Sequence, residues 1–568
     1  MKTSTAWTVF CLVAAVLGVL FFWPLWRVVS GGFFVDGHLT LRYLGGVFQN
    51  PVYLEGLLNS LKIALGTTFL AMCIALPLAW LSNQFDFAGK GLFSALVLVP
   101  MILPPFVGAI GFQQIFGTYG LVNTLFHLGP RDWLGGGQYI GVVLLQTLSL
   151  YPILYLNAVA SLANIDPAMD EAAANLGCTR LRRFWRITLP LMMPGLFAGG
   201  TLIFIWSFTE LGTPLIMNYT RCAPVQVFDS LKEIGSNPFP YALVVVMLAA
   251  GTGLYALSKV LFGGKAYAMQ SKATTQAGAR RLRGWRGTLA VLPFVVVTGL
   301  ALMPHLGVIL TSFAEPGSWY QSILPARFSG GNYVAALGHE MTVSSIRNSL
   351  LFSSLAVCFD IVAGIAIAFV VVRSKLRVRG VLDALSMVPL AVPGLVMAFG
   401  FCSVSSWLAN LPAADRYSWW LPLFDIRTNP TLFLILAYSV RRMPYMVRSA
   451  VAGLQQTSET FEEAAANLGA GPATTLRRIT LPLILANLIA GALLTFAFSM
   501  LEVSDSLMLA QKAAFMPITK AIYELFQLIG TGRYVAAALG VWAMAFLTCT
   551  LVGASVLLGK KLGALFRV

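Results

Sequence analysis

Five ionisable residues lie within otherwise apolar stretches of the chain. Glu210 stands in SFTELGTP, Glu502 stands in SMLEVSDS, and Asp505 follows three residues later. Arg441 and Arg442 are adjacent in AYSVRRMPYMVRSA. An Arg guanidinium is a planar fork of donors that suits a carboxylate, phosphate or phosphonate, and ionisable groups inside a membrane often mark a transport path. We expect these residues to line such a path; the alternative is that the arginines pair with Glu502 or Asp505 for structural reasons.

Catalytic and metal-binding patterns are missing from the sequence. The four His residues are scattered, and the seven Cys residues occur singly without C-x-x-C spacing. A phosphate-binding loop of the G-x-x-x-x-G-K-[ST] type is also lacking. We therefore expect no catalytic residue, no metal site and no cofactor in this chain, so that it is not an enzyme.

A polar block of 20 residues occurs twice between apolar stretches. EAAANLGCTRLRRFWRITLP runs over 171–190, and EAAANLGAGPATTLRRITLP over 463–482, 292 positions later. Asp166 and Ser458 are expected to cap a short helix in each copy, and Gly177 and Gly469 to end it in a left-handed conformation. A second, basic helix follows in each copy. The sequence thus predicts two equivalent helical knobs outside the lipid; the alternative is a pair of amphipathic helices on the membrane surface.

The composition places the rest of the chain in a membrane. Hydrophobic residues make up 58% of it and charged residues only 11%, whereas soluble proteins have about 25% charged residues. Runs of roughly 20 apolar residues are long enough to span a bilayer as helices. We predict an all-α polytopic membrane protein with about 12 transmembrane helices, near 6–29, 57–81, 92–116, 140–163, 191–216, 240–262, 288–312, 348–372, 381–406, 431–454, 483–510 and 533–558.

The duplication extends over the whole chain. Asn59-Ser60-Leu61 recurs as Asn348-Ser349-Leu350, VPMILPPFVGAIGF recurs as VPLAVPGLVMAFGF, and Glu210 aligns with Glu502. We therefore divide the chain into a half at 1–263, a basic linker at 264–287 and a half at 288–568, as two parallel repeats of six helices. Prolines in the recurring segments are expected to kink helices near the path.

Positive charge sets the expected orientation. The net charge is +16, and the Lys and Arg residues gather in short loops beside the apolar runs, as the positive-inside rule requires. With both termini in the cytoplasm, the linker, the run RSKLRVR and both repeated blocks fall on the cytoplasmic side. The same distribution excludes nucleic acid as a partner, because the basic residues have no soluble domain to present them.

The repeated block resembles the cytoplasmic loop of the membrane subunits of ABC importers, the binding-protein-dependent permeases of the type I class. The shared pattern is EAA, a Gly six positions after the Glu, and I-x-L-P, and both halves contain it. In this sequence its residues are Glu171, Ala172, Ala173, Gly177, Ile187, Leu189 and Pro190, then Glu463, Ala464, Ala465, Gly469, Ile479, Leu481 and Pro482.

That resemblance implies a function and partners. Each block would be a coupling helix on one of two copies of an ATPase subunit, which binds ATP and Mg²⁺, and a periplasmic or lipid-anchored binding protein would deliver the solute. The location would be the bacterial inner membrane, in contact with lipid. The fused format is most similar to ferric-iron permeases and those for organophosphonates such as 2-aminoethylphosphonate, with thiamine or another small solute as an alternative. An ion-coupled secondary transporter is the alternative from a different class, but it has no need of the repeated knob.

Overall fold

The computed structural model describes residues 3–35, 37–102, 104–262, 280–410 and 421–557, and these are almost entirely helical. The expectation of an all-α polytopic membrane protein is confirmed. The first half contains α1 (Thr3–Leu17), η1 (Gly18–Phe22), α2 (Trp23–Phe33), α3 (Arg42–Gln49), α4 (Pro51–Gln84), α5 (Lys90–Leu96), α6 (Val99–Ile102), α7 (Pro105–Phe116), α8 (Leu121–Leu125), η2 (Gly136–Gln138), α9 (Tyr139–Ala163), α10 (Pro167–Asn175), α11 (Arg180–Arg183), η3 (Phe184–Thr188), α12 (Leu189–Phe208), α13 (Gly212–Ile216), α14 (Ala223–Asp229), η4 (Ser230–Glu233) and α15 (Phe239–Phe262).

The second half repeats this order. It contains α16 (Trp285–Phe313), α17 (Gly331–Gly338), α18 (Glu340–Arg373), α19 (Arg379–Ala391), α20 (Gly394–Ala409), α21 (Leu421–Phe424), α22 (Thr431–Gln456), α23 (Thr460–Asn467), α24 (Pro472–Thr475), η7 (Leu476–Thr480), α25 (Leu481–Met500), α26 (Ser504–Leu509), η8 (Ala513–Phe515), α27 (Ile518–Gln527) and α28 (Gly532–Leu557).

Two short strand pairs accompany the helices. β1 (Phe34–Val35) and β2 (His38–Leu39) are antiparallel, whereas β3 (Phe85–Asp86) and β4 (Arg280–Arg281) are parallel. The pairing of β3 with β4 attaches the end of the predicted linker to the end of α4. The greater part of the linker, residues 264–279, lies outside the described residues.

The helices account for the predicted spans. Among the described residues, nine helices are long and apolar enough to cross a membrane, and up to eleven when each of two bent pairs counts as one span. The remaining predicted span, 431–454, corresponds to α22, which has 26 residues but carries Arg441, Arg442 and Arg448. This helix packs between α18 and α25, so the side chains of Arg441 and Arg442 are largely buried, whereas that of Arg448 is partly exposed.

Each half contains one sharply broken helix at an equivalent position. The axis bends by 97° between Lys90–Met101 and Pro105–Leu125, and by 96° between Arg379–Ala391 and Gly394–Ala409. Pro104 and Pro393 stand at the breaks in an extended conformation, and each is the residue before the next helix. Proline lacks the amide hydrogen that a continuous helix needs, and its ring disfavours a helical conformation in the residue before it. The predicted kinks are therefore complete breaks here.

The first helices of the two halves are exchanged. α1 contributes Ala6, Val13 and Leu17 to a hydrophobic cluster with α18, α22 and α25, and α2 packs on α20. In return, α16 contributes Phe294 and Ala301 to the cluster of α4, α9 and α12, and packs closely on α7. The two halves of the sequence are thus not two separate bodies in space, because each completes the core of the other.

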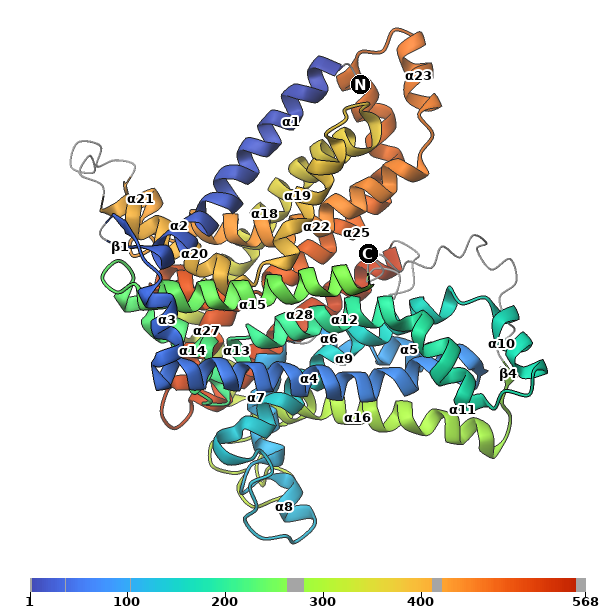
Figure 1. The fold of residues 1–568 in the computed structure, drawn as a ribbon. Helices are drawn as coiled ribbons and strands as arrows, with labels where there is room; N and C mark the ends of the chain where they lie inside the picture. Colours follow the sequence, from blue (N-terminus) through green and yellow to red (C-terminus); the bar gives the residue numbers. More distant parts are fainter. Residues whose placement is uncertain (1–2, 36, 103, 263–279, 411–420, 558–568) are drawn as a thin grey trace.

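The two bundles diverge from a common base (Figure 1). One arm holds α18, α22 and α25 and ends in α23, and the other holds α4, α9 and α12 and ends in α10. Near the base α14 and α27 meet, with the rings of Phe228 and Tyr523 edge to face at 6.3 Å. The molecule therefore presents its two repeated blocks at the separate tips of the arms.

Glycine permits the close contact on which the exchange of α16 depends. A Cβ atom added to Gly111 of α7 would collide with the backbone of Pro304, Gly307 and Val308 in α16. Gly400, at the equivalent position in α20, would meet the backbone of Pro24 in α2 at 2.9 Å. Small residues allow membrane helices to approach closely enough for backbone contact. Gly111 and Gly400 thus allow the exchanged helices α16 and α2 to pack directly against α7 and α20.

We expect Gly111→Ala to lower the stability of the purified protein by about 1–3 kcal/mol, because the added methyl group forces α7 and α16 apart. The measurement is the midpoint of thermal unfolding in detergent. Gly299→Ala is the matched control, since Gly299 also lies in α16 but nothing is within 4 Å of its Cβ position. An equal effect of both substitutions would show that the close contact does not govern the packing of α16.

Candidate functional site

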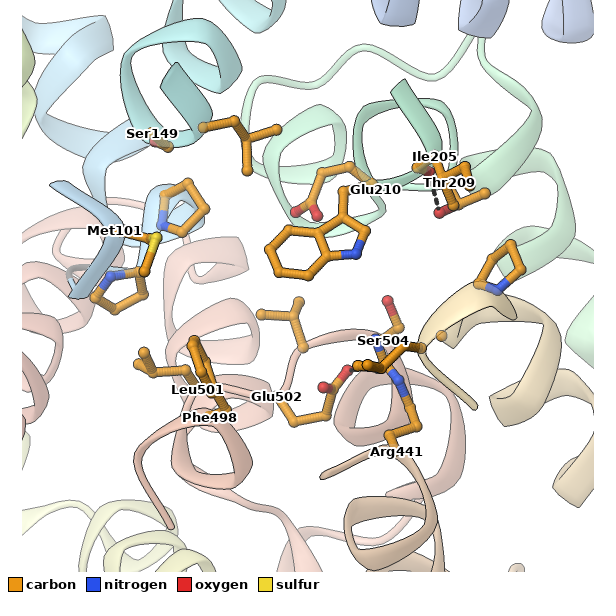
Figure 2. Close-up of a pocket in the computed structure, with 18 of the residues that line it drawn as sticks. Met101, Ser149, Ile205, Thr209, Glu210, Arg441, Phe498, Leu501, Glu502 and Ser504 are labelled. Atoms are coloured by element: carbon orange, nitrogen blue, oxygen red, sulfur yellow. Dashed lines mark hydrogen bonds and ion pairs between the residues drawn. The ribbon is translucent and has the colours of Figure 1, made fainter. Parts of the chain in front are cut away.

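A cavity with about 180 Å³ of free space lies where the broken helices of the two halves meet. Its walls come from the breaks after α6 and α19, from α9 and α22, and from the ends of α12 and α25 (Figure 2). Many of the lining residues are pairs at equivalent positions in the two halves, namely Pro100 and Pro389, Met101 and Leu390, Pro104 and Pro393, Ser149 and Arg441, Leu150 and Arg442, Trp206 and Phe498, and Glu210 and Glu502. The cavity therefore lies on the axis that relates the two halves.

The helix ends explain how both glutamates reach the cavity. α25 ends at Met500 and α26 begins at Ser504, so Glu502 lies in the break between them. Its carbonyl oxygen accepts hydrogen bonds from the hydroxyl groups of Thr519 (2.8 Å) and Ser506 (2.6 Å). These bonds replace those that a continuous helix would supply to this oxygen. Glu210 lies in the equivalent break between α12 and α13, and its carboxylate accepts a hydrogen bond from the amide of Thr213 at 3.3 Å.

The four ionisable residues that the sequence singles out in the second half form one cluster. Glu502 accepts short hydrogen bonds from Arg441 through one carboxylate oxygen and from Arg442 through the other, and Arg441 also reaches Asp505 at 3.4 Å. The side chains of Glu502 and Asp505 are 4% and 0% exposed, so both acids are shielded from solvent. Such charges are stable inside a protein only when partners compensate their lost hydration. Arg441, Arg442 and Glu502 are paired and also line the cavity, whereas Asp505 pairs with Arg441 but is not among the residues that line it.

Two neighbours hold the arginines in place. The guanidinium of Arg441 lies so close to Gly394 that any side chain there would collide with it. The guanidinium of Arg442 lies over the ring of Phe498, 5.3 Å from its centroid, in a cation–π contact. Both arginines line the cavity, although Glu502 neutralises much of their charge.

Glu210 faces this cluster from the other wall (Figure 2). Within the described part of the chain it forms no ion pair of the kind that holds Glu502. The residues at the positions equivalent to Arg441 and Arg442 are Ser149 and Leu150. One wall of the cavity is therefore strongly charged, and the other carries a single carboxylate.

Asp360 is a buried acid that our reading of the sequence missed. It is fully buried in α18 and accepts a short hydrogen bond from Ser439 of α22, while its second carboxylate oxygen has no hydrogen-bond partner. The signal was present, because an acid inside an apolar run is the criterion that singled out Glu210. The equivalent residue in α4 is Ala71, so this polar contact also belongs to the second half alone.

The repeated blocks form two short helices each, as their capping residues predict. Asp166 accepts a hydrogen bond from the amide of Ala168 at 2.9 Å and caps α10, and Gly177 and Gly469 have φ values of +78° and +81°. The prediction for Ser458 needs correction. Glu459 occupies the capping position before α23, and the Ser458 hydroxyl accepts from the amide of Thr460 at 3.3 Å. The turn still satisfies the first amide of the helix.

The two knobs expose equivalent apolar side chains. Leu176 and Leu468, each directly before the left-handed glycine, are 88% and 89% exposed. Met169 and Phe461, also at equivalent positions, are about half exposed. The motif residues Glu171, Ala172, Gly177, Glu463, Ala464 and Gly469 are exposed as well, whereas Ala173 is partly buried and Ala465 buried. Each tip therefore exposes two apolar side chains at equivalent positions, and exposed apolar surface of this kind is typical of a site that binds a protein or a membrane.

A family of known proteins matches both halves. The model of the family described as the binding-protein-dependent transport system inner membrane component matches residues 71–262 and 360–557. The chain belongs to this family. It is therefore the permease component of an importer and a multi-pass membrane protein, with two copies of the family's domain in one chain.

Relatives of this permease differ in the solute for which they are named. A protein named as a ferric transport system permease of Haemophilus influenzae is 26% identical over 82% of this chain and 70% of its own length. One named as a molybdenum ABC transporter permease of Haloferax volcanii is 34% identical over 36% of this chain and 74% of its own. One named as a 2-aminoethylphosphonate transport system permease of Salmonella typhimurium is 28% identical over 43% of this chain and 88% of its own.

We expect Glu502→Gln to lower the stability of the permease by about 3–5 kcal/mol, because Arg441 and Arg442 lose the carboxylate that they share. Thermal unfolding in detergent measures this loss. Glu210→Gln is the matched control at the equivalent position, and its effect is expected to be small because no ion pair is broken. Similar losses in the two variants would contradict the asymmetric arrangement of charge.

Proposed function

We propose that this permease is the fused transmembrane subunit of an ABC importer, and that α10 and α23 are the coupling helices on which two copies of a separate ATPase subunit dock. The observation that carries this proposal is the pair of equivalent exposed leucines, Leu176 and Leu468, directly after these two helices, which lie at the tips of the two arms (Figure 1). Two identical ATPase subunits need two equivalent docking surfaces, and the duplicated fold supplies them. ATP and Mg²⁺ would be bound by those subunits, so this chain itself needs no cofactor.

The divergence of the arms suggests how coupling works. With the knobs on the cytoplasmic side, as the positive charge of the neighbouring loops favours, the arms open toward the cytoplasm while α14 and α27 close the opposite end. Closure of the ATPase pair would bring α10 and α23 together and rotate the two bundles about their common base. The cavity at the helix breaks would then open toward the outside, where a periplasmic or lipid-anchored binding protein releases its solute.

For the solute we propose ferric iron or an organophosphonate. The names of the relatives support these two classes, and the charges in the cavity are compatible with either. A phosphonate suits the guanidinium groups of Arg441 and Arg442, which it would share with the carboxylate of Glu502. A ferric ion would instead be attracted by Glu210. Thiamine remains the alternative solute, whereas membership of this family argues against an ion-coupled carrier.

We expect the double substitution Leu176→Asp and Leu468→Asp to release the ATPase subunit from the purified complex, because each change places a charge on the proposed docking surface. Co-purification of the ATPase with the permease measures this. The control is Ile529→Asp, which alters a fully exposed apolar residue in the connection between α27 and α28, away from both knobs. Undiminished co-purification of the double variant would exclude α10 and α23 as the docking sites.

The identity of the solute can be determined from uptake into proteoliposomes that contain the permease, its ATPase and its binding protein. We expect accumulation of ⁵⁵Fe or of labelled 2-aminoethylphosphonate, and Arg442→Lys to slow uptake of the phosphonate more than that of iron, because lysine lacks the planar fork. Arg448→Lys is the control, since Arg448 lies in the same helix but does not line the cavity. Accumulation of thiamine and neither of the others would contradict the proposed solute class.

A further inference from the structure

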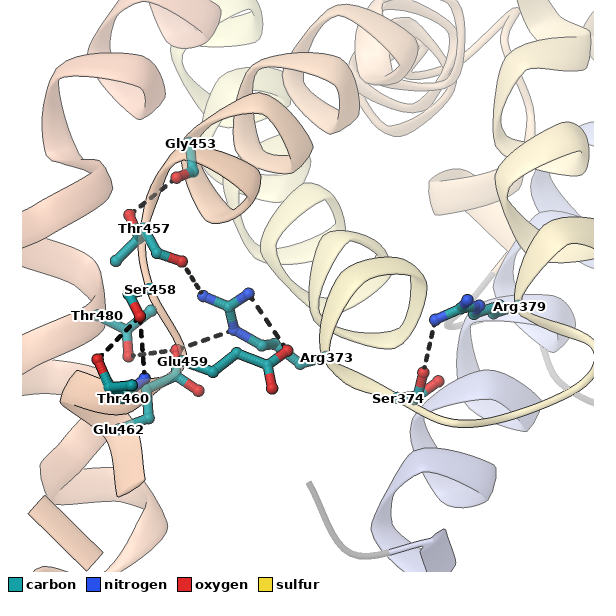
Figure 3. A network of polar contacts seen from close by, with 10 residues as sticks. All are labelled: Arg373, Ser374, Arg379, Gly453, Thr457, Ser458, Glu459, Thr460, Glu462 and Thr480. Carbon is teal, nitrogen blue, oxygen red and sulfur yellow. Dashed lines mark hydrogen bonds and ion pairs between the residues drawn. The ribbon is translucent and has the colours of Figure 1, made fainter. Parts of the chain in front are cut away.

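Arg373 joins the second knob to the bundle beneath it. It is the last residue of α18, and its side chain is only 6% exposed. Its guanidinium donates to Glu462 of α23 at 3.2 Å and to the carbonyl oxygen of Thr457 at 2.8 Å, and it lies 3.6 Å from Glu459 (Figure 3). A single side chain thus contacts α23, the residue before it and the loop that leads into it from α22.

Glu462 continues this connection to the other side of the knob. The oxygen that accepts from Arg373 also accepts from the hydroxyl of Thr480 at 3.3 Å, and Thr480 is the last residue of η7, directly before α25. The three long helices of this arm, α18, α22 and α25, are therefore all linked to α23 through Arg373 and Glu462 (Figure 3). Hydrogen bonds between charged groups are stronger than neutral ones, and burial of the Arg373 side chain protects them from water.

The first half lacks the cation that makes this connection. The residue at the end of α4 equivalent to Arg373 is Gln84, which is exposed, and the residue equivalent to Glu459 is Pro167. The chain that follows Gln84 instead pairs with the linker, where the amide of Leu282 donates to the carbonyl oxygen of Asp86 at 2.8 Å. The end of α4 therefore has no charged side chain equivalent to Arg373.

We propose that Arg373 is a positioning residue that clamps α23 to α18, so that the second knob moves as one rigid body with its arm. The inference rests on the proposed function in one respect, since α23 transmits force only if the ATPase docks there. The clamp itself is a property of this chain. It makes the second coupling helix depend on one ion-pair network that has no charged counterpart at the end of α4.

Hydrogen exchange of the full-length permease in detergent tests the clamp without its partners. We expect Arg373→Gln to increase amide exchange in residues 457–469 on the order of tenfold, because the charged hydrogen bonds that hold the knob closed are lost. Exchange in residues 165–177, the equivalent segment of the first half, should not change. Arg379→Gln is the matched control, since Arg379 begins α19 just after the same connection but donates to the carbonyl oxygen of Ser374 at 3.1 Å and does not contact the knob.

A variant in which the two charges are swapped distinguishes a specific clamp from general destabilisation. We expect Arg373→Glu combined with Glu462→Arg to restore much of the protection that Arg373→Glu alone removes. If Arg373→Gln leaves exchange in 457–469 unchanged, or raises it equally in both segments, the inference is overturned. Should Arg373→Gln and Arg373→Glu fail to fold, the double variant compared with Arg373→Lys, which keeps the charge, still tests whether an ion pair at these positions protects α23.

Coupling is measured in the reconstituted transporter as solute transported per ATP hydrolysed. We expect this ratio to fall several-fold in Arg373→Gln while the ATPase still co-purifies, and to remain normal in Arg379→Gln. A normal ratio in Arg373→Gln would overturn the role of the clamp in coupling and leave the docking proposal intact. If the ATPase binds elsewhere on the wild-type chain, the docking proposal fails, and hydrogen exchange still decides the clamp.

Discussion

The structure depends on how buried charge is neutralised at the meeting point of the two halves. Glu502 can lie there only because α25 ends just before it and because Arg441 and Arg442 take both of its oxygens. The arginines in turn need the space left by Gly394 after the break at Pro393, and Phe498 beneath Arg442. Removal of one charge would leave its partner buried without compensation, which costs more than the ion pair gains. The helix breaks, the ion pairs and the cavity are thus one interdependent arrangement.

The exchange of the first helices gives this arrangement its stability. Each bundle contains a helix from the opposite half of the sequence, so the halves cannot separate without exposing both hydrophobic clusters. The contacts at the base also include the short helices α14 and α27, which meet through Phe228 and Tyr523. In the proposed mechanism the arms would change their angle while the exchanged helices and this base stay packed.

The sequence alone predicts the features that depend on local patterns. The apolar runs predicted the spans, and Asp166 and the two glycines predicted the ends of the knob helices. Of the prolines expected to kink helices, Pro104 and Pro393 stand at the two breaks, whereas Pro152, Pro389 and Pro444 lie inside helices. It did not predict the exchange of α1 and α16, because the apolar face of a helix fits either bundle equally well. The distribution of partners around Glu502 was also undetermined, since two arginines and two acids allow several pairings and only the backbone breaks select one. Asp360 was not predicted because, unlike Glu502, it has no acidic counterpart in the first half, where the equivalent residue is Ala71.

Four charged residues of the cavity and of its arm occur in the second half only. Arg441, Arg442, Asp360 and Arg373 all belong to the second half, where the first half has Ser149, Leu150, Ala71 and Gln84. Two identical subunits could not differ in this way, since every charge would appear on both walls of the cavity and a bound ion would find two equal sites in opposite orientations. A fused chain can place its cluster on one wall and leave Glu210 alone on the other. If the solute passes through this cavity as proposed, one with charge at one end would have a single preferred orientation there, which duplication followed by divergence permits and symmetry forbids.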